Sequence, residues 1–343
     1  MLAVFTEEQN MLDDAVKKFA RDYGLNSPAD LKVIDRTAGW KALSEMGLAG
    51  LRMRDSSGAP MASAVEIAIA VGALAERLVP LPLLGTAILP MELLALSNAP
   101  AERLSAVSEG RQSLCILFDA ELAKVAEEGG QTAYSWDCQG AEFGLSITPS
   151  GTDFIVALHP IVSANDHKGA DLTRAVSQVE VGEPIERYKL SAGNRDRWLA
   201  FALTLLAADI LGAMRGALNG AVEYSKVRIQ YKVPIGSFQA VQHMCSEALV
   251  KITGTVGTVN YAAWSIDELT PAEALLAART AKAYAASVGR PVCETVMQVY
   301  GGLGQTWESI AHLYLRRVMV STYLLGGLQS MLAGIADARL GGK

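Results

Sequence analysis

The chain has 343 residues, of which 50% are hydrophobic and 19% charged, so a disordered polypeptide is excluded. Its 30 basic and 36 acidic residues give a net charge of −6, which argues against binding of nucleic acid. Four widely spaced cysteines without a CxxC pair indicate a reduced, cytoplasmic protein and no metal site. The longest apolar stretch, 198–214, contains Asp209 and is shorter than the roughly 20 residues of a membrane span, so we expect a buried core helix.

Residues 1–110 are predicted to form an N-terminal helical domain. Thr6, followed by Gln9 three residues later, has the form of a capping box, in which each side chain satisfies a free backbone N–H group. Further helices are expected over 38–46, 62–78 and 89–96. Proline cannot continue a helix, so Pro80 and Pro82 mark the end of the second of these.

The hydrophobic period changes between residues 111 and 190, where we predict a β domain of reduced size. Short β-branched or alternating segments bounded by Gly, Pro, Asn and Asp are typical of strands. Such segments lie at 113–118, 143–147, 153–158 and 176–181. The polar segment 163–169 is expected to be an exposed loop.

Residues 191–343 are predicted to form a C-terminal helical bundle, and the high apolar content of the chain indicates that some of its surface makes oligomer contacts. Thr270 before Pro271, with Glu273 at the third position, marks a helix start. The expected helices cover 198–227, 238–265, 270–300 (where Pro291 can interrupt the helix), 308–323 and a last segment to 339. The fold class is therefore α+β and mainly α, in the order helical, β, helical.

Two motifs in the C-terminal part carry candidate binding residues, and the first is Arg228-Ile-Gln-Tyr-Lys-Val-Pro-Ile-Gly-Ser-Phe-Gln239. A guanidinium at a helix end, an aromatic residue three positions later and a tight Pro-Ile-Gly turn suit a pyrophosphate and a stacked ring. The alternative is an ordinary helix–turn–helix in which Arg228 is solvated.

The second motif is Gln298-Val-Tyr-Gly-Gly-Leu-Gly304, a glycine turn between two apolar helices. Glycine permits positive φ and close approach of the backbone to a ligand. A Rossmann fingerprint is disfavoured, because no strand precedes the turn. We therefore interpret the turn as the contact of a phosphate-bearing cofactor.

Together the motifs resemble those of the acyl-CoA dehydrogenase family, whose members carry an Arg-x-x-Phe-Gly-x-x-Ile/Val-x-x-Phe-Gln segment and, further along, Gln-x-x-Gly-Gly-x-Gly. Here these segments begin at Arg228 and Gln298. Trp40-Lys-Ala-Leu-Ser-Glu-Met-Gly-Leu-Ala-Gly50 looks like the family's early helix. Thr306-Trp-Glu-Ser-Ile-Ala-His-Leu-Tyr-Leu-Arg-Arg317 is similar to a branch common among steroid-degrading members.

The resemblance implies an FAD-dependent flavoprotein that introduces an α,β double bond into an acyl-CoA thioester, as in β-oxidation and lipid metabolism. In this family a carboxylate removes the α-proton, the flavin accepts the β-hydride, and electron-transfer flavoprotein reoxidises the flavin. The family's FAD contacts, which reach across a subunit interface, correspond to Arg228, Tyr231 (where Phe is usual), Phe238, Gln239, Gln298, Gly301 and Gly302.

The chain departs from the family where the base should be. The family's Tyr-Glu-Gly-Thr glutamate corresponds to Leu325, and a second known location corresponds to Ala202. Neither side chain can take up a proton, so no catalytic residue is assigned. The family's Thr-Glu-Pro-like flavin loop is also replaced, by Phe118-Asp-Ala-Glu-Leu-Ala-Lys124, and Trp136 is the only tryptophan nearby. The remaining carboxylates and imidazoles near the motifs are interpreted as structural: Glu247, Glu294, Glu308, His243 and His312.

The prediction is a base-lacking subunit of a heteromeric, α2β2 acyl-CoA dehydrogenase, inactive alone. It lends part of the FAD site to a partner that carries the glutamate, and a steroid side-chain thioester is the favoured substrate. One alternative is a self-sufficient homo-oligomeric dehydrogenase with a relocated base, for which Glu247 is tested first. The other is a non-enzymatic pseudo-subunit that touches no flavin. No membrane, metal or nucleic acid is expected to bind.

Overall fold

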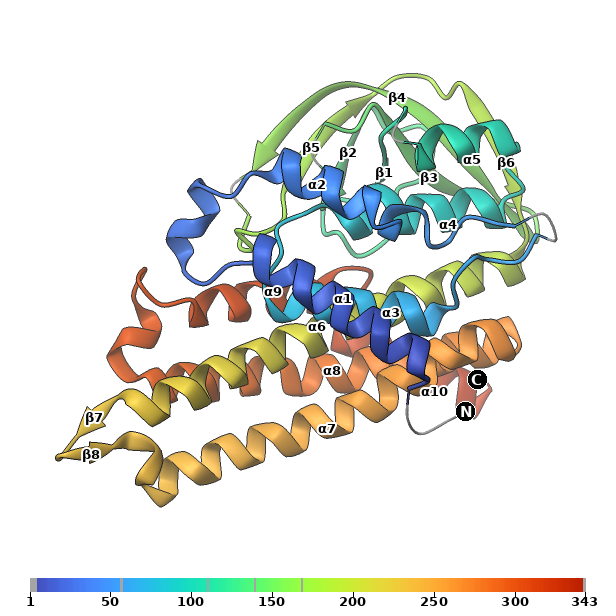
Figure 1. The fold of residues 1–343 in the computed structure, drawn as a ribbon. Coiled ribbons are helices and arrows are strands. Elements are labelled where there is room, and N and C mark those ends of the chain that lie inside the picture. Colours follow the sequence, from blue (N-terminus) through green and yellow to red (C-terminus); the bar gives the residue numbers. More distant parts are fainter. Residues whose placement is uncertain (1–4, 56–57, 110, 139, 168, 342–343) are drawn as a thin grey trace.

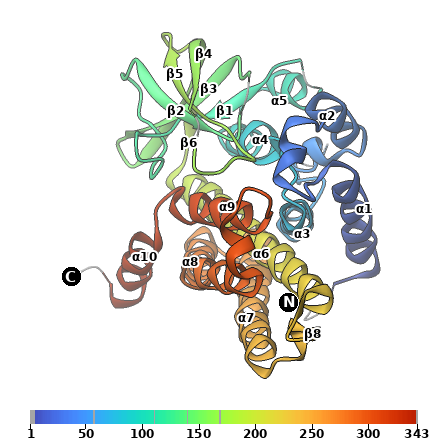
Figure 2. The same cartoon turned by 90° about the vertical axis from the view of Figure 1, so that its left-hand side faces the viewer.

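The chain folds into three regions that pack against one another: a helical N-terminal part, a curled sheet and a helical bundle (Figures 1 and 2). The structure is a computed structural model that describes residues 5–55, 58–109, 111–138, 140–167 and 169–341. Helices dominate both ends of the chain and strands its middle, so the predicted mainly helical α+β class is confirmed.

The N-terminal part begins with the predicted capping box. Gln9 N donates to Thr6 Oγ1 at 3.2 Å, and Thr6 N donates to Gln9 Oε1 at 3.1 Å. These two bonds satisfy backbone donors that the first helical turn leaves free. The helices of this part are α1 (Glu7–Tyr23), α2 (Arg36–Glu45), α3 (Ala64–Glu76), α4 (Leu89–Leu96) and α5 (Ala101–Ser108).

The sheet has the strand order β1-β3-β4-β5-β2, with β6 paired to β4. Phe118, just after β1, pairs with Tyr134 of β2, which joins the two ends of this order and curls the sheet. Its strands are β1 (Leu114–Ile116), β2 (Thr132–Trp136), β3 (Phe143–Ser150), β4 (Asp153–His167), β5 (Val176–Val181) and β6 (Glu186–Leu190).

The prediction of a loop over 163–169 is wrong as far as His167, because β4 continues to that residue; residue 168 lies outside the described residues. The second half of β4 pairs with β5, the next strand along the chain, after a register shift between Ile161 and Ser163. Side chains 162–167 are all exposed, as expected, so this extension has no buried face and no apolar alternation. Backbone pairing, which no side-chain pattern reveals here, forms this part of the strand.

The bundle is built around α6 (Ala192–Val227), which is buried from 200 to 214. At Gly212 a Cβ would lie 2.1 Å from the carbonyl oxygen of Gly72, so glycine lets α3 approach α6 closely. The other elements are β7 (Ile229–Gln230), β8 (Val233–Pro234), α7 (Gln239–Glu268), α8 (Pro271–Tyr300), α9 (Ala311–Tyr323) and α10 (Leu328–Leu340).

The helices of the bundle differ from the expectation at several points, and α6 begins at Ala192 rather than at 198. Helix α8 runs unbroken through Pro291, whose neighbours Val292 and Cys293 are fully buried, so tertiary packing outweighs the lost hydrogen bond. Helix α9 begins at Ala311 rather than 308, because residues 306–310 form the turn that follows the glycines.

Two stretches, Ala192–Val227 and Ala311–Leu340, are long and apolar enough to cross a membrane by length and composition. The apolar window of the first is 89% buried in the fold, as expected of a core helix, while that of the second is 33% buried. The second stretch is divided by a turn at 324–327, between α9 and α10.

The three regions are joined by a buried charged cluster, the arginine joint, formed by Asp171, Arg174, Asp209 and Arg317. Asp209 of α6 accepts from Arg317 Nη2 at 2.7 Å and from Arg174 Nη1 at 3.0 Å. Arg174 Nε donates to Asp171 at 2.7 Å, and Arg317 Nη1 donates to the Val79 carbonyl at 3.2 Å. Burial disfavours the charged form of Asp209, but the two arginines outweigh it and lower the pKa of this carboxyl.

Candidate functional site

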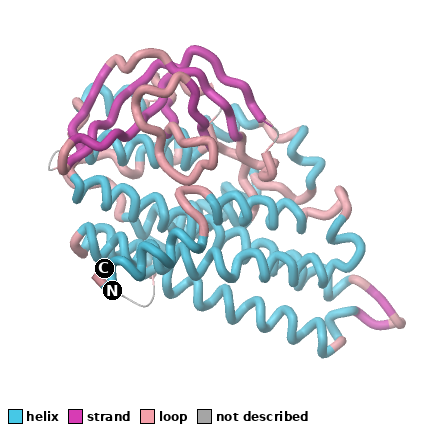
Figure 3. The backbone as a smooth tube through the Cα atoms, turned by 180° about the vertical axis from the view of Figure 1, so that it is seen from behind, coloured by secondary structure: helices cyan, strands magenta, loops and turns pink. Residues whose placement is uncertain are grey.

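Both sequence motifs lie at the same end of the bundle. Helix α6 ends at Val227, and the β7–β8 hairpin projects from the fold beyond it (Figures 1 and 3). Helix α8 ends at Tyr300 and is followed by the 3₁₀ turn Gly301–Gln305. The ring of Tyr224, one helical turn before the first motif, stacks on the ring of Tyr300 in the second motif with centroids 4.6 Å apart, so the ends of α6 and α8 lie next to each other.

The predicted binding side chains of the first motif are open to solvent. Tyr231, at the tip of the hairpin, is 89% exposed and stands edge-on to Phe238, with ring centroids 6.2 Å apart. Arg228 is exposed, and the described residues provide no hydrogen-bond or ion-pair partner for its side chain. Gln239 and, from the second motif, Gln298 are exposed as well. An unpaired guanidinium beside exposed aromatic rings suits a ligand or partner outside this chain.

The glycines of the second motif fall into two kinds. A Cβ at Gly304 would lie 2.5 Å from the Met297 carbonyl oxygen, so this glycine is required by packing within the chain. A Cβ at Gly301 or Gly302 would meet no heavy atom within 4 Å. Gly301 also has φ +64° and ψ −142°, a conformation essentially restricted to glycine. The backbone of these two residues therefore faces open space.

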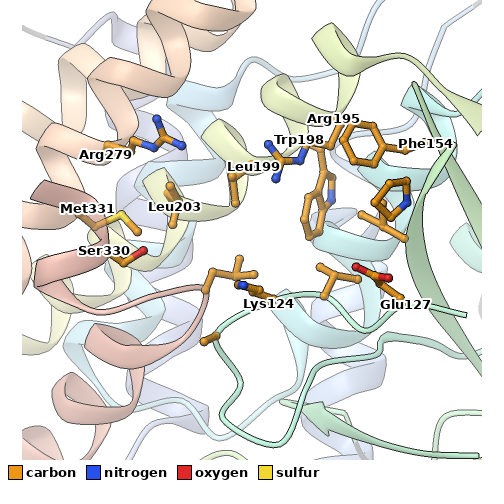
Figure 4. A pocket seen from close by; sticks show the side chains of 15 residues that line it. Lys124, Glu127, Phe154, Arg195, Trp198, Leu199, Leu203, Arg279, Ser330 and Met331 are labelled. Atoms are coloured by element: carbon orange, nitrogen blue, oxygen red, sulfur yellow. The ribbon is translucent and has the colours of Figure 1, made fainter. Parts of the chain in front are cut away.

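A cavity of about 300 Å³ lies between the sheet and the bundle (Figure 4). Arg195 and Arg279 lie along one side of it, and Lys124 and Glu127 along the other. Its apolar lining includes Phe154, Trp198, Leu199, Leu203, Leu325 and Met331. An apolar interior with three cations around it suits an amphipathic anion.

No carboxylate suited to abstract a proton lies at either predicted position for the base. Leu325 lines the cavity, and Ala202 is fully buried in α6. Among the described residues that line the cavity, Glu127 is the one carboxylate, and it is exposed at the side of the cavity. Glu247 is exposed on α7 and does not line the cavity, so the first choice for a relocated base gains no support.

The other residues set aside as structural have local partners or remain exposed. Glu294 pairs with Arg290 at 2.6 Å on the surface. His312 Nδ1 accepts from Arg316 Nε at 3.3 Å, and burial together with Arg316 lowers the pKa of this imidazole. Glu308 and His243 are exposed and lie outside the cavity.

The segment that replaces the family's flavin loop is folded against the bundle. Leu325 N donates to the Leu122 carbonyl at 2.9 Å. The Arg174 guanidinium lies 4.7 Å from the Trp136 ring centroid, and Trp136 is only 1% exposed. This indole therefore offers no open surface for a planar ring, whereas Ala120, Glu121 and Lys124 of the loop are exposed.

Lys282 of α8 is fully buried, and the pH dependence of the free energy of unfolding tests how this burial affects the pKa of its amine. Burial lowers its pKa from 10.5 to about 7. From pH 7 to about 10 the unfolded chain holds a proton that the folded chain lacks, so stability rises with pH by up to about 1.4 kcal/mol per unit. We expect Lys282→Met to remove this part of the rise, as measured by urea unfolding at pH 7 and 9. An equal rise of the free energy of unfolding between pH 7 and 9 in wild type and variant would contradict the lowered pKa of Lys282.

Comparisons with known proteins agree with this architecture. Residues 198–340 match the family model "Acyl-CoA dehydrogenase, C-terminal domain". Acyl-CoA dehydrogenase IpdE2 of Mycobacterium tuberculosis is 30% identical over 294 residues, which cover 85% of this chain and 84% of that protein. Acyl-CoA dehydrogenase FadE34 of the same species is 28% identical over 95% of this chain, and the chain spans only 47% of that protein.

Solved structures show the same fold. A variant of the Tcur3481-Tcur3483 steroid ACAD aligns with a TM-score of 0.84 at 21% identity, over 98% of both chains. The ChsE4-ChsE5 complex from Mycobacterium tuberculosis aligns with a TM-score of 0.80 at 22% identity, over 98% of both chains. The chain belongs to the acyl-CoA dehydrogenase family, whose members are FAD-dependent oxidoreductases.

The residues at the end of the bundle fit FAD. The unpaired Arg228 guanidinium can bind phosphate oxygens, and the open backbone of Gly301 and Gly302 lets a phosphate or ribose approach closely. The exposed Tyr231 and Phe238 rings can cover an aromatic system. All of these groups are exposed and lie outside the chain's own cavity, so they are accessible to a ligand held outside this chain.

Proposed function

We propose that this chain is the base-lacking subunit of a heteromeric acyl-CoA dehydrogenase. In this assembly, expected to be α2β2, FAD is held chiefly by a second family member that carries the glutamate. The favoured substrate is a CoA thioester of a steroid side chain, and electron-transfer flavoprotein is the electron acceptor. The residues that this chain lends to FAD are Arg228, Tyr231, Phe238, Gln239, Gln298, Gly301 and Gly302.

One observation carries the proposal: the residues suited to FAD are open and unpaired, while the chain's own cavity has Leu325 in place of a base. An unpaired arginine at the surface loses little when a partner brings an anion to it. The names of the two solved relatives above, one a complex and one a joint Tcur3481-Tcur3483 dehydrogenase, support a heteromeric arrangement.

FAD, when bound, supplies the acceptor for the β-hydride. The contribution of this chain is binding and orientation. Arg228 neutralises phosphate charge, Gly301 and Gly302 leave room for close backbone approach, and Tyr231 with Phe238 excludes water from the ring. Proton removal is left to the partner, because neither Leu325 nor Ala202 can take up a proton.

The first test is purification of the chain alone and together with a second family member. We expect the chain alone to be colourless and inactive, and the complex to contain FAD and to desaturate an acyl-CoA. A chain that is yellow and active alone would contradict the heteromeric proposal. It would favour the self-sufficient alternative, in which Glu127, the carboxylate that lines the cavity, becomes the first candidate base.

Arg228→Ala in the co-expressed complex is expected to lower FAD affinity at least about tenfold, because a charge-assisted hydrogen bond contributes about 1.5–3 kcal/mol. FAD per complex, measured by absorbance after dilution, is the readout. Arg21→Ala is the matched control, since Arg21 is an exposed arginine on α1. Unchanged FAD content with Arg228→Ala would favour the pseudo-subunit alternative.

A further inference from the structure

The turn between α9 and α10 connects the bundle to the sheet at one wall of the cavity. Leu325 in this turn has φ +57°, and Leu122 in the facing loop has φ +56°. Residues other than glycine avoid this left-handed region because their Cβ crowds the backbone. The two strained leucines are joined by the hydrogen bond from Leu325 N to the Leu122 carbonyl at 2.9 Å.

Lys282 also holds this turn, through hydrogen bonds to its backbone carbonyls. Its side chain extends from α8 and is completely buried. Lys282 Nζ donates to the Leu324 carbonyl at 2.9 Å and is 3.5 Å from the Gly326 carbonyl, so it brackets Leu325. Within the part of the chain that the structure describes, no carboxylate pairs with Lys282, whose partners are backbone carbonyls.

A lysine buried without a counterion is unfavourable for packing alone. Leucine or methionine would fill similar space at lower desolvation cost. What lysine adds is hydrogen-bond donors for carbonyls at the C-terminal end of α9, where the helix itself offers none. Strain that persists at one place in a fold requires surrounding groups that hold it, and it is frequently associated with a functional site.

The held turn connects two segments that line the cavity. One contains Leu325 itself and, beyond the turn, Ser330 and Met331. The other contains Lys124 and Val125, which follow the Leu122 carbonyl bound by Leu325. Displacing the turn would therefore move both lining segments together.

We propose that Lys282 is a positioning residue for the cavity: it holds the 324–326 turn in its strained form and, through the Leu325–Leu122 hydrogen bond, fixes the position of the two lining segments relative to each other. This role rests on the contacts within the chain and does not depend on the proposed FAD half-site. Lys282 does not line the cavity, so it acts through the turn.

Local hydrogen exchange tests this role. In Lys282→Met, we expect the Leu325 amide and the 119–126 loop to exchange at least tenfold faster than in the wild type. Amides in the β3–β4 pair should be unchanged, since a general loss of stability would move them too. Lys282→Arg, which keeps N–H donors at this position, should restore protection to within threefold.

Relief of the strain provides a second, independent measurement. Glycine adopts φ +57° without a Cβ clash, so Leu325→Gly should make the turn less dependent on Lys282. The effect of Lys282→Met on loop exchange should therefore be at least threefold smaller in the Leu325→Gly background.

A second variant covers the case in which Lys282→Met alone fails to fold. Lys282→Gln, which keeps a neutral donor, then replaces it in both assays and is expected to show an intermediate effect. Unchanged exchange at Leu325 and in the 119–126 loop in the folded variant would overturn the proposal.

Discussion

Replacing Gly302 with aspartate is expected to remove FAD from the co-expressed complex while this subunit stays folded. A Cβ at Gly302 meets nothing within 4 Å, and its φ lies outside the left-handed region, so the chain itself accommodates a side chain here. In the proposed complex the same space faces the cofactor. A carboxylate would then fill the space where the backbone approaches FAD and would repel its phosphates.

The expected loss of FAD affinity is at least about 100-fold, equivalent to about 2.7 kcal/mol, because steric exclusion and charge repulsion act together. Bound FAD per complex and the apparent Kd on readdition are the measurements. Gly257→Asp is the matched control: it lies on the exposed part of α7, where a Cβ also meets nothing within 4 Å. If Gly302→Asp keeps full FAD occupancy and wild-type affinity, the turn does not contact the cofactor.

Replacing Asp209 with alanine is expected to lower the free energy of unfolding by about 3–5 kcal/mol, because it leaves the Arg174 and Arg317 guanidiniums buried without their shared carboxylate. Asp209 is completely buried and accepts from both arginines, and also from Ser321 Oγ at 2.6 Å. Removing one member of such a cluster costs more than a hydrophobic replacement of the whole cluster would.

Urea unfolding measures this loss, and Asp153→Ala is the control. Asp153 pairs with Lys189 at 3.1 Å, but the lysine side chain is 76% exposed, so this pair should contribute less than about 1 kcal/mol. Since domains are commonly stable by about 5–15 kcal/mol, Asp209→Ala should approach the threshold of folding. Equal losses for both variants would show that the arginine joint does not stabilise the fold.

The sequence predicted the features that depend on local pattern. The capping box at Thr6 and the start of α8 at Pro271 require only side chains three residues apart, and both formed as expected. The helical–β–helical order followed from the change in hydrophobic period. The strand extension to His167 could not be predicted, because its residues alternate in no apolar pattern and are held by backbone pairing with β5.

The candidate site divides in the same way. Arg228 and Gly301 were singled out from residue type, spacing and the resemblance to the family, whereas Arg195, Arg279 and Lys124 come together around the cavity from three separate segments. No local signal marks those three cations. Glu127 was not predicted as a candidate for the same reason: it lies in a polar stretch, and no local pattern distinguishes it from a surface glutamate.

By itself the sequence determined that this chain carries the family's cofactor motifs and lacks a proton acceptor at 202 and 325, because side-chain chemistry follows from residue identity. Only the tertiary structure decided which of these groups are open and which are covered. Gly302 faces empty space while Gly304 is packed, and Trp136 is covered by Arg174. Exposure depends on contacts between segments far apart in the chain, and local sequence does not encode those contacts.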